Sequence, residues 1–122
     1  MADLESKSFD TPDEVREFQD GKGAVRVLNF DSGAVGRGTF EPGWRWSEHV
    51  KPIAGTDSCQ VQHIGYVLKG RMKVRMDNGD EAEVGPGDAF HMAPGHDAWI
   101  EGDEACELLD FGGLTGYAQP SS

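Results

Sequence analysis

The chain has few of the residues that a disulfide scaffold or a nucleic-acid-binding surface requires. Its 122 residues include only 2 cysteines and 11 basic residues, against 22 acidic ones. Two cysteines make no disulfide framework, and in a cytosolic protein we expect both to be reduced. The net charge of −11 disfavours nucleic acid and anionic membranes, because binding to them depends on clustered Lys and Arg. The acidity instead favours solubility and neutral or cationic ligands.

The sequence also lacks a long hydrophobic run. No apolar stretch approaches the roughly 20 residues that a membrane-spanning helix needs. The first residues, Met1 to Glu5, have neither the basic flank nor the apolar core of a secretion signal. We therefore expect a cytoplasmic protein without a membrane partner. A length of 122 residues predicts one domain with a modest single core.

Glycine is abundant, and turns separate many short apolar runs. The 17 glycines and 6 prolines fit an all-β barrel. Strict alternation of polar and apolar residues from Arg71 to Met76 predicts a half-buried strand, and Asn78-Gly79 predicts a type I′ hairpin turn after it. Strands are expected at 24–30, 34–40, 59–68, 71–76, 81–84, 88–92, 97–101 and 105–111.

The N-terminal segment, residues 1–23, is predicted to carry a short helix. Thr11 would cap this helix, Pro12 would take its first position, and Glu14 would complete a capping box. These three residue types in this spacing are typical of a helix start.

The barrel is expected to span residues 24–111, followed by a tail over 112–122. Leu114 and Tyr117 would pack this tail on the outside of the barrel. Apolar side chains spaced along the expected strands are predicted to form the core and the pocket lining: Val67, Met72, Val74, Phe90, Trp99, Leu109 and Phe111.

Several framework motifs resemble those of the cupin family. Gly65-Tyr66-Val67-Leu68-Lys69-Gly70 is similar to the closing strand of the first cupin motif, and Phe40-Glu41-Pro42-Gly43 to its lead-in. Gly85-Pro86-Gly87-Asp88 and Pro94-Gly95 are similar to the framework of the second motif. The resemblance covers most of the chain. It implies a single-domain double-stranded β-helix of the jelly-roll type, with small ligands bound inside the barrel, and a homodimer that covers exposed strand edges.

The same resemblance implies a divalent metal at the barrel centre. Metal-binding cupins hold it with two His and one Glu from the first motif and one His from the second. In this chain the first His position falls on His49, the second on Lys51 and the Glu position on His63, while His96 lies two residues before the last position. We expect His49, His63 and His96 to be the ligands, and such a set is compatible with Zn, Ni, Fe, Mn or Cu.

Two alternatives to this assignment remain open. An alignment without a long insertion places the His pair of the first motif on Asp57 and Cys59 instead. The histidines can also be ordinary hydrogen-bonded polar groups, so that the barrel holds no metal.

Further side chains are predicted to line the ligand site. Trp46 and Trp99 offer ring faces for stacking on an aromatic or cationic ligand. Lys51 can act as an acid or bind a carboxylate. Cys59 with His63 suggests a nucleophile pair, although no orienting third group is evident from the sequence. Trp46, Lys51, Cys59 and Trp99 are therefore the expected ligand-binding residues.

Two classes of function follow from these residues. The first is a metal-dependent enzyme acting on a small organic molecule, as an oxygenase, isomerase or lyase. The second is a non-catalytic module that binds or senses a small metabolite without metal. The fold does not decide between them, because this kind of barrel hosts both. The pair His49 and His63 favours the first class, and the loss of the Glu and second His positions favours the second.

Overall fold

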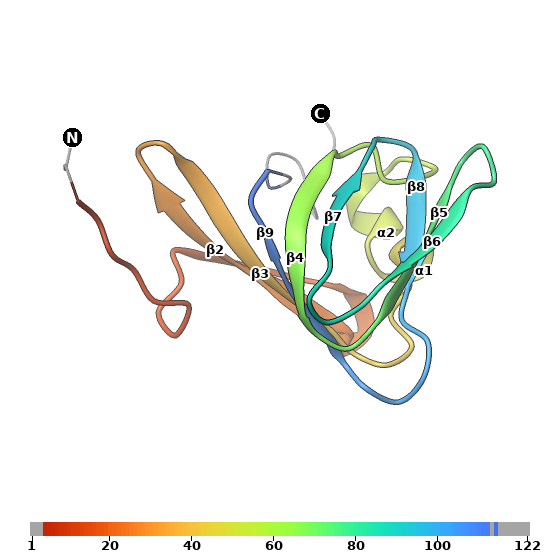
Figure 1. Ribbon diagram of the computed structural model, residues 1–122, viewed down its shortest axis with the longest axis horizontal. Coiled ribbons are helices and arrows are strands. Elements are labelled where there is room, and N and C mark those ends of the chain that lie inside the picture. Colours follow the sequence, from red (N-terminus) through yellow and green to blue (C-terminus); the bar gives the residue numbers. More distant parts are fainter. Residues whose placement is uncertain (1–3, 113, 115–122) are drawn as a thin grey trace.

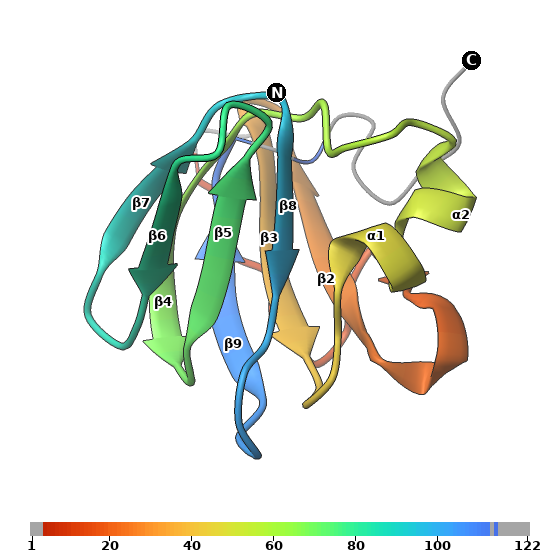
Figure 2. The ribbon, with the colours of Figure 1, turned by 90° about the vertical axis from the view of Figure 1, so that its right-hand side faces the viewer.

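Two antiparallel β-sheets form the computed structural model, which describes residues 4–112 and 114 (Figures 1 and 2). The larger sheet has the strand order β1-β2-β3-β9-β4-β7, and the smaller sheet has the order β6-β5-β8. This architecture confirms the predicted all-β class. No helix among the described residues has the length and apolar character needed to cross a membrane.

The strands are short, as the spacing of turn residues predicts. In chain order the elements are β1 (Glu14–Glu17), the 3-10 turn η1 (Gln19–Gly21), β2 (Gly23–Phe30), β3 (Gly33–Phe40), α1 (Trp46–His49), α2 (Lys51–Ala54), β4 (His63–Lys69), β5 (Met72–Met76), β6 (Glu81–Val84), β7 (Ala89–Met92), β8 (His96–Trp99) and β9 (Cys106–Asp110).

The prediction of a helix starting after Thr11 is wrong. Residues Glu14–Glu17 form β1, which pairs antiparallel with β2, and only the turn η1 follows it. The side chains of β1 alternate between half-buried and exposed, as in a strand. The edge of β2 offers ladder hydrogen bonds to this segment, and such tertiary pairing overrides a local capping signal. The division into N-terminal segment, barrel and tail stays a prediction.

The hairpin between β5 and β6 is present, but its turn differs from the expected type I′. Within this turn only Gly79 has a positive φ, of 96°, and the φ of Asn78 is negative. The Asn78 side chain accepts a hydrogen bond of 2.9 Å from the backbone of Asp80. This local bond stabilises a longer turn in which only one residue is left-handed.

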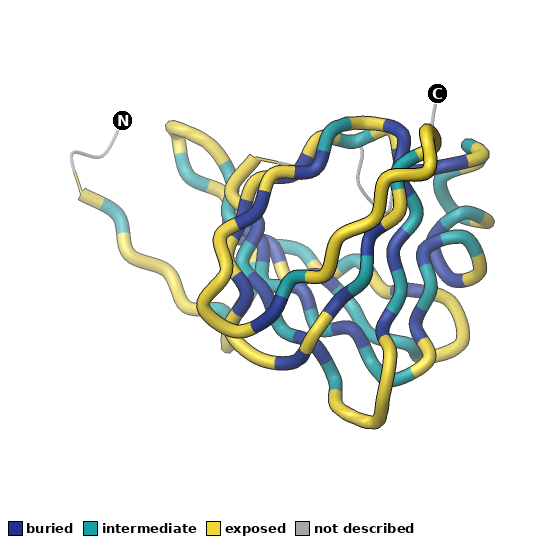
Figure 3. The backbone as a smooth tube through the Cα atoms, turned by 45° about the vertical axis from the view of Figure 1, so that its right-hand side comes forward, coloured by how far each residue is buried: buried dark blue, intermediate teal, exposed yellow. Residues whose placement is uncertain are grey.

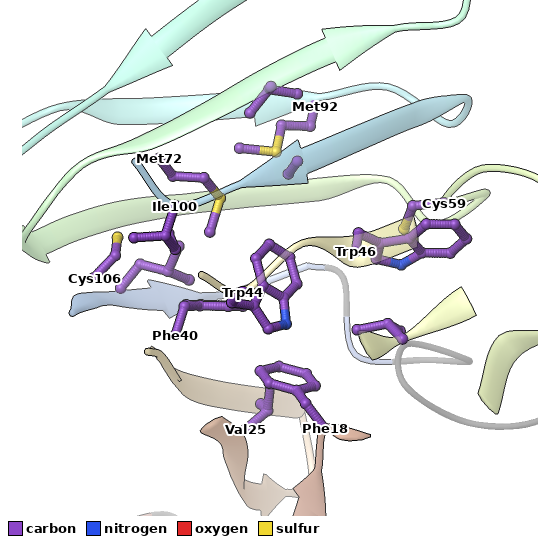
Figure 4. Packing of buried hydrophobic residues seen from close by; sticks show 14 of the residues in the cluster. Phe18, Val25, Phe40, Trp44, Trp46, Cys59, Met72, Met92, Ile100 and Cys106 are labelled. Atoms are coloured by element: carbon purple, nitrogen blue, oxygen red, sulfur yellow. The ribbon is translucent and has the colours of Figure 1, made fainter. Parts of the chain in front are cut away.

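The core lies between the two sheets, and buried positions alternate with exposed ones along the strands (Figure 3). Phe18, Phe40 and Trp44 pack together there, with ring centroids 4.7 to 5.5 Å apart (Figure 4). Trp44 is only 1% exposed, so it is a core residue.

Four of the expected core residues, Val67, Met72, Val74 and Phe90, are buried. The assignment of Phe111 is wrong, because 51% of it is exposed, and Trp99 and Leu109 are only half-buried. In β9 it is Cys106, Leu108 and Asp110 that face inward. The side chain of Asp110 therefore faces the core, while that of Leu109 lies partly outside it.

The tail is described only as far as residue 114. Leu114 is 5% exposed and belongs to the core cluster, and its carbonyl accepts a hydrogen bond from Arg16. Its methyl groups occupy the space beside Gly36, where a Cβ would lie 2.7 Å from the nearest of them. Tyr117 lies outside the described residues.

The two sheets are connected differently at their two long sides. Beside β8, single bridges join Arg45 to Trp99 and Cys59 to His96, so that the segment carrying α1 and α2 covers this side. On the other side the edge strands β6 and β7 form no ladder with each other. The bridges beside β8 position the candidate site, whereas the missing ladder between β6 and β7 leaves the wall of the barrel interrupted.

Candidate metal centre

Three buried side chains meet between the sheets: Cys59, His63 and His96. One possible ligand atom from each lies within 4.8 Å of the others. Cys59 Sγ is 3.6 Å from His63 Nε2, and the two imidazole centroids are 5.5 Å apart. Cysteine and histidine are the ligands that zinc and several transition metals prefer.

The backbone explains why residues distant in the sequence converge here. Cys59 donates a backbone hydrogen bond of 2.7 Å to the carbonyl of His96 and accepts one of 3.2 Å from its amide. This bridge holds Cys59 at the edge of β8. His63 begins β4 at an inward-facing position, since its side chain, Gly65 and Val67 are buried while the intervening residues are exposed.

Each histidine is anchored through its Nδ1 atom. His63 Nδ1 lies 2.6 Å from a carboxylate oxygen of Asp110, and His96 Nδ1 lies 2.8 Å from the carbonyl oxygen of Ala93. These oxygens accept hydrogen bonds, so Nδ1 is the donor in both rings. The Nε2 atom of each ring is thereby left as the possible ligand atom beside Cys59 Sγ. This second layer of oxygen acceptors is typical of metal-binding histidines.

The charges of Cys59 and His63 depend on each other. Burial alone would raise the pKa of the Cys59 thiol, but its hydrogen bonds with His63 and His96 outweigh this effect and lower the pKa to about 6. Burial would likewise lower the pKa of His63, yet hydrogen bonds with Asp110 and Cys59 raise it to about 9. Without metal, the site near neutral pH is therefore a thiolate beside an imidazolium, backed by the Asp110 carboxylate. A thiolate is the form of cysteine that binds metal.

A cavity of about 30 Å³ adjoins the two histidines. Its walls are buried and mostly apolar: Val25, Gly38, Phe40, Trp44, His63, Met72, Phe90, Met92, His96, Ala98, Leu108 and Asp110. A space of this volume has room for about two water molecules. Among the described residues, Trp44 Nε1 is the one buried side-chain nitrogen or oxygen without a hydrogen-bond partner. The cavity can thus admit a small ligand atom but no ring.

His49 does not join this group, contrary to the expected convergence of His49 with His63. Its Nδ1 lies 3.0 Å from the backbone nitrogen of Arg45, and its Nε2 lies 3.8 Å from an Asp20 carboxylate oxygen and 4.0 Å from one of Glu48. The position of His49 was predicted by counting forward from Phe40 as if the strand continued to His49. The chain instead turns through α1 and α2, so the strand spacing does not apply there.

Of the four expected ligand-binding residues, only Cys59 lies at the centre. Trp46 is buried in the core, and Lys51 lies 3.7 Å from Asp57 at the start of α2. Trp99 packs under the Arg45 guanidinium, 4.6 Å from the ring centroid. None of these three lines the cavity.

The residue that sequence reasoning missed is Asp110. It provides the orienting third group that the pair of Cys59 and His63 lacked. The available signal was an acidic residue in register with inward-facing Cys106 and Leu108 of the last strand. The alignment without an insertion, which placed a ligand position on Cys59, agrees better with this geometry than the alignment that chose His49.

Comparison with known protein families identifies the family to which this chain belongs. The cupin domain matches residues 39–112, which is more than half of the chain. The chain belongs to the cupin family. A search among curated proteins finds no significant match for this cupin.

Solved structures share the fold of this cupin at low sequence identity. An RmlC-like cupin from Shewanella frigidimarina NCIMB 400 is 21% identical, with a TM-score of 0.55, over 83% of this chain and 84% of that one. KdgF from Halomonas sp. is 21% identical, with a TM-score of 0.52, over 77% and 82%. FeII HppE is 10% identical, with a TM-score of 0.63, over 90% of this chain and 60% of that one. At these identities the likeness concerns the fold alone.

Proposed function

We propose that this cupin holds one divalent metal ion through Cys59, His63 and His96, and that it binds and transforms a small organic molecule at this ion. The observation that carries the proposal is the anchoring of both imidazoles. Each Nδ1 faces an oxygen acceptor, and the remaining ring nitrogens are directed at one thiol. Ordinary buried histidines need no such common focus.

The spacing of the ligand atoms supports the proposal. In a tetrahedral site with a metal–sulfur bond of about 2.3 Å and a metal–nitrogen bond of about 2.0 Å, sulfur and nitrogen lie about 3.5 Å apart. The distance between Cys59 Sγ and His63 Nε2 is 3.6 Å. Cys59 and His63 therefore need little movement to accept an ion, and the ligand atom of His96 lies within 4.8 Å of theirs.

Three protein ligands leave coordination positions for an exogenous molecule, as in catalytic metal sites. A bound divalent ion supplies Lewis acidity, which polarises a substrate or lowers the pKa of a water molecule. The chain itself contributes the orientation of His63 by Asp110 and of His96 by the Ala93 carbonyl. Its apolar walls exclude bulk water from the cavity. Among the structural neighbours, the name FeII HppE itself records iron.

Metal analysis of protein purified without a nickel column tests the proposal. We expect about one equivalent of a transition metal, or one equivalent after reconstitution. Cys59→Ser, His63→Gln and His96→Gln should lose it. His49→Gln and His91→Gln are the matched controls, because these histidines lie outside the group, and both should retain it. In a cobalt(II)-substituted sample, the sulfur-to-cobalt absorption band should vanish with Cys59→Ser. No metal after reconstitution would overturn the proposal.

A second candidate uses the same residues without metal. Cys59, His63 and Asp110 form a nucleophile, a base and an orienting carboxylate, with distances of 3.6 Å and 2.6 Å between successive groups. This is the order found in thiol-based acyl transfer. If it is correct, metal-free protein should take the acetyl group of S-methyl thioacetate onto Cys59 with release of methanethiol, as seen by mass spectrometry of the protein. Cys59→Ser should abolish the acetyl adduct, and added zinc should suppress it. A protein with neither metal nor acetyl adduct would belong to the non-catalytic class.

A further inference from the structure

The wall of the barrel is interrupted where the edge strands β6 and β7 face each other (Figure 2). A groove of about 170 Å³ follows this seam. Its buried side chains are Val74, Phe90 and Met92, and the exposed residues Asp80 and Glu81 stand at its rim. The remaining lining residues are Met76, Ala82, Val84 and His91.

Two side chains belong to both hollows. Phe90 and Met92 line the seam groove and also the cavity beside His63 and His96. Met92 pairs with His63 across β4 and β7, and Phe90 pairs with Gly65. A Cβ on Gly65 would lie 2.7 Å from the tip of the Phe90 ring, so the glycine provides the space in which this ring lies. Phe90 and Met92 are therefore the partition between the groove and the inner cavity.

The two volumes suit different occupants. The inner cavity, with about 30 Å³, has no room for an organic ring. The groove, with about 170 Å³, is similar to the engineered apolar cavity of about 150 Å³ that binds benzene. Its exposed carboxylates, together with a net charge of −11, repel anions.

We infer that the β6–β7 seam is the binding site and entrance for an uncharged, largely apolar molecule of about the size of benzene. The molecule rests against Phe90 and Met92, and rotation of these two side chains opens the way to the inner cavity. Delivery to a metal ion rests on the proposed function, whereas binding in the groove does not.

The methionines provide the test. Met76 and Met92 line the groove, and Met72 lines only the inner cavity. We expect benzene, added to metal-free protein carrying carbon-13 in its methionine methyl groups, to shift the signals of Met76 and Met92. The Met72 signal should move only in Phe90→Ala, where the partition is reduced.

Two matched substitutions separate the groove from the outer surface. Ala82→Phe fills the groove and should weaken benzene binding at least about tenfold. Ala89→Phe adds the same ring to an exposed position of the neighbouring strand that does not line the groove, and binding should be unchanged. Unmoved Met76 and Met92 signals at saturating benzene, or equal effects of the two substitutions, would overturn the inference. Metal analysis is independent of this result, so either proposal can fail alone.

Discussion

His63 and Asp110 form a buried hydrogen bond of 2.6 Å between β4 and β9, and each side chain is only 7% exposed. The two strands are neighbours in the larger sheet, so this bond orients the imidazole from within that sheet. Cys59 and His96 approach from the opposite side. The candidate centre therefore depends on the spacing between the two sheets.

Removing the charge of Asp110 should weaken metal binding. Asp110→Asn keeps the shape of the side chain but replaces the carboxylate that orients His63. We expect the metal affinity to fall about 10- to 100-fold, as for other second-layer carboxylates. Competition with a chromophoric chelator measures this change. Asp103→Asn, at an exposed position, is the control and should bind as the wild type does. Equal affinities in both variants would remove the orienting role.

The thiol of Cys59 should ionise at unusually low pH in metal-free protein. Thiolate absorbance near 240 nm should rise with a midpoint near pH 6, in line with the lowered pKa of Cys59. Cys106 should contribute nothing below pH 9, because burial and the nearby Glu107 and Glu104 carboxylates raise its pKa to about 12. Cys59→Ser should abolish the step. A midpoint near pH 9 would contradict the proposed ion pair.

The same ionisation should appear in the free energy of unfolding. The pKa of Cys59 falls from 9.0 in the unfolded chain to about 6 in the folded one. Its stabilising contribution is complete above pH 9 and is lost as the pH falls through 6. Metal-free wild type should therefore lose more stability than Cys59→Ser between pH 8 and pH 5, as measured by urea unfolding. Parallel losses in the two proteins would show that the thiolate contributes nothing.

Gly65 should not tolerate a methyl group. A Cβ at this position would lie 2.0 Å from the backbone oxygen of Leu109, and the backbone cannot move away without breaking the β4–β9 pairing. We expect Gly65→Ala to destabilise the fold by about 3 kcal/mol, at the upper end for overpacking. Thermal unfolding measures it. In Gly112→Ala the new methyl would meet only the Ile64 side chain, at 2.7 Å, and that side chain can turn aside. A similar loss in both variants would contradict this explanation.

A homodimer remains an expectation that the outer face of β4 makes testable. Ile64, Tyr66 and Leu68 are 39 to 52% exposed there, and Phe111 nearby is 51% exposed. Apolar side chains grouped on one sheet face are typical of an interface between protein chains. Light scattering should give a dimer for the wild type and a monomer for the double variant Ile64→Asp, Tyr66→Asp.

Val15→Asp is the control for the dimer, since Val15 is similarly exposed but lies on β1, at the far edge of the same sheet. It should remain dimeric. A monomeric wild type at micromolar concentration would show that the expectation of a homodimer is wrong.

The patterns that were interpreted correctly are local ones. Alternation from Arg71 to Met76, followed by turn residues, predicted a hairpin that the structure has at β5 and β6. The type of its turn was wrong, because Asn78 bonds to Asp80 through its side chain instead of adopting a positive φ. The helix predicted after Thr11 was wrong for a related reason: a free strand edge competed with the capping signal.

The residues of the candidate metal centre were predicted only in part, and their role as ligands stays a prediction. His63 and His96 followed from the cupin framework, and Cys59 appeared as a ligand-site residue and in the second alignment. His49 was placed by counting along a strand that α1 and α2 replace. Asp110 could not be paired with His63 from the sequence, since 46 residues separate them and the register of β4 against β9 decides their contact.

The sequence by itself determined the β class and the framework of the barrel, because turn residues and side-chain alternation act over a few neighbouring positions. Only the tertiary structure decided which polar groups meet inside. Convergence of Cys59, His63, His96 and Asp110 requires a bridge to β8, an inward register in β4 and an adjacent β9. Each of these is a pairing between distant segments, and its free energy depends on the packing of the whole barrel.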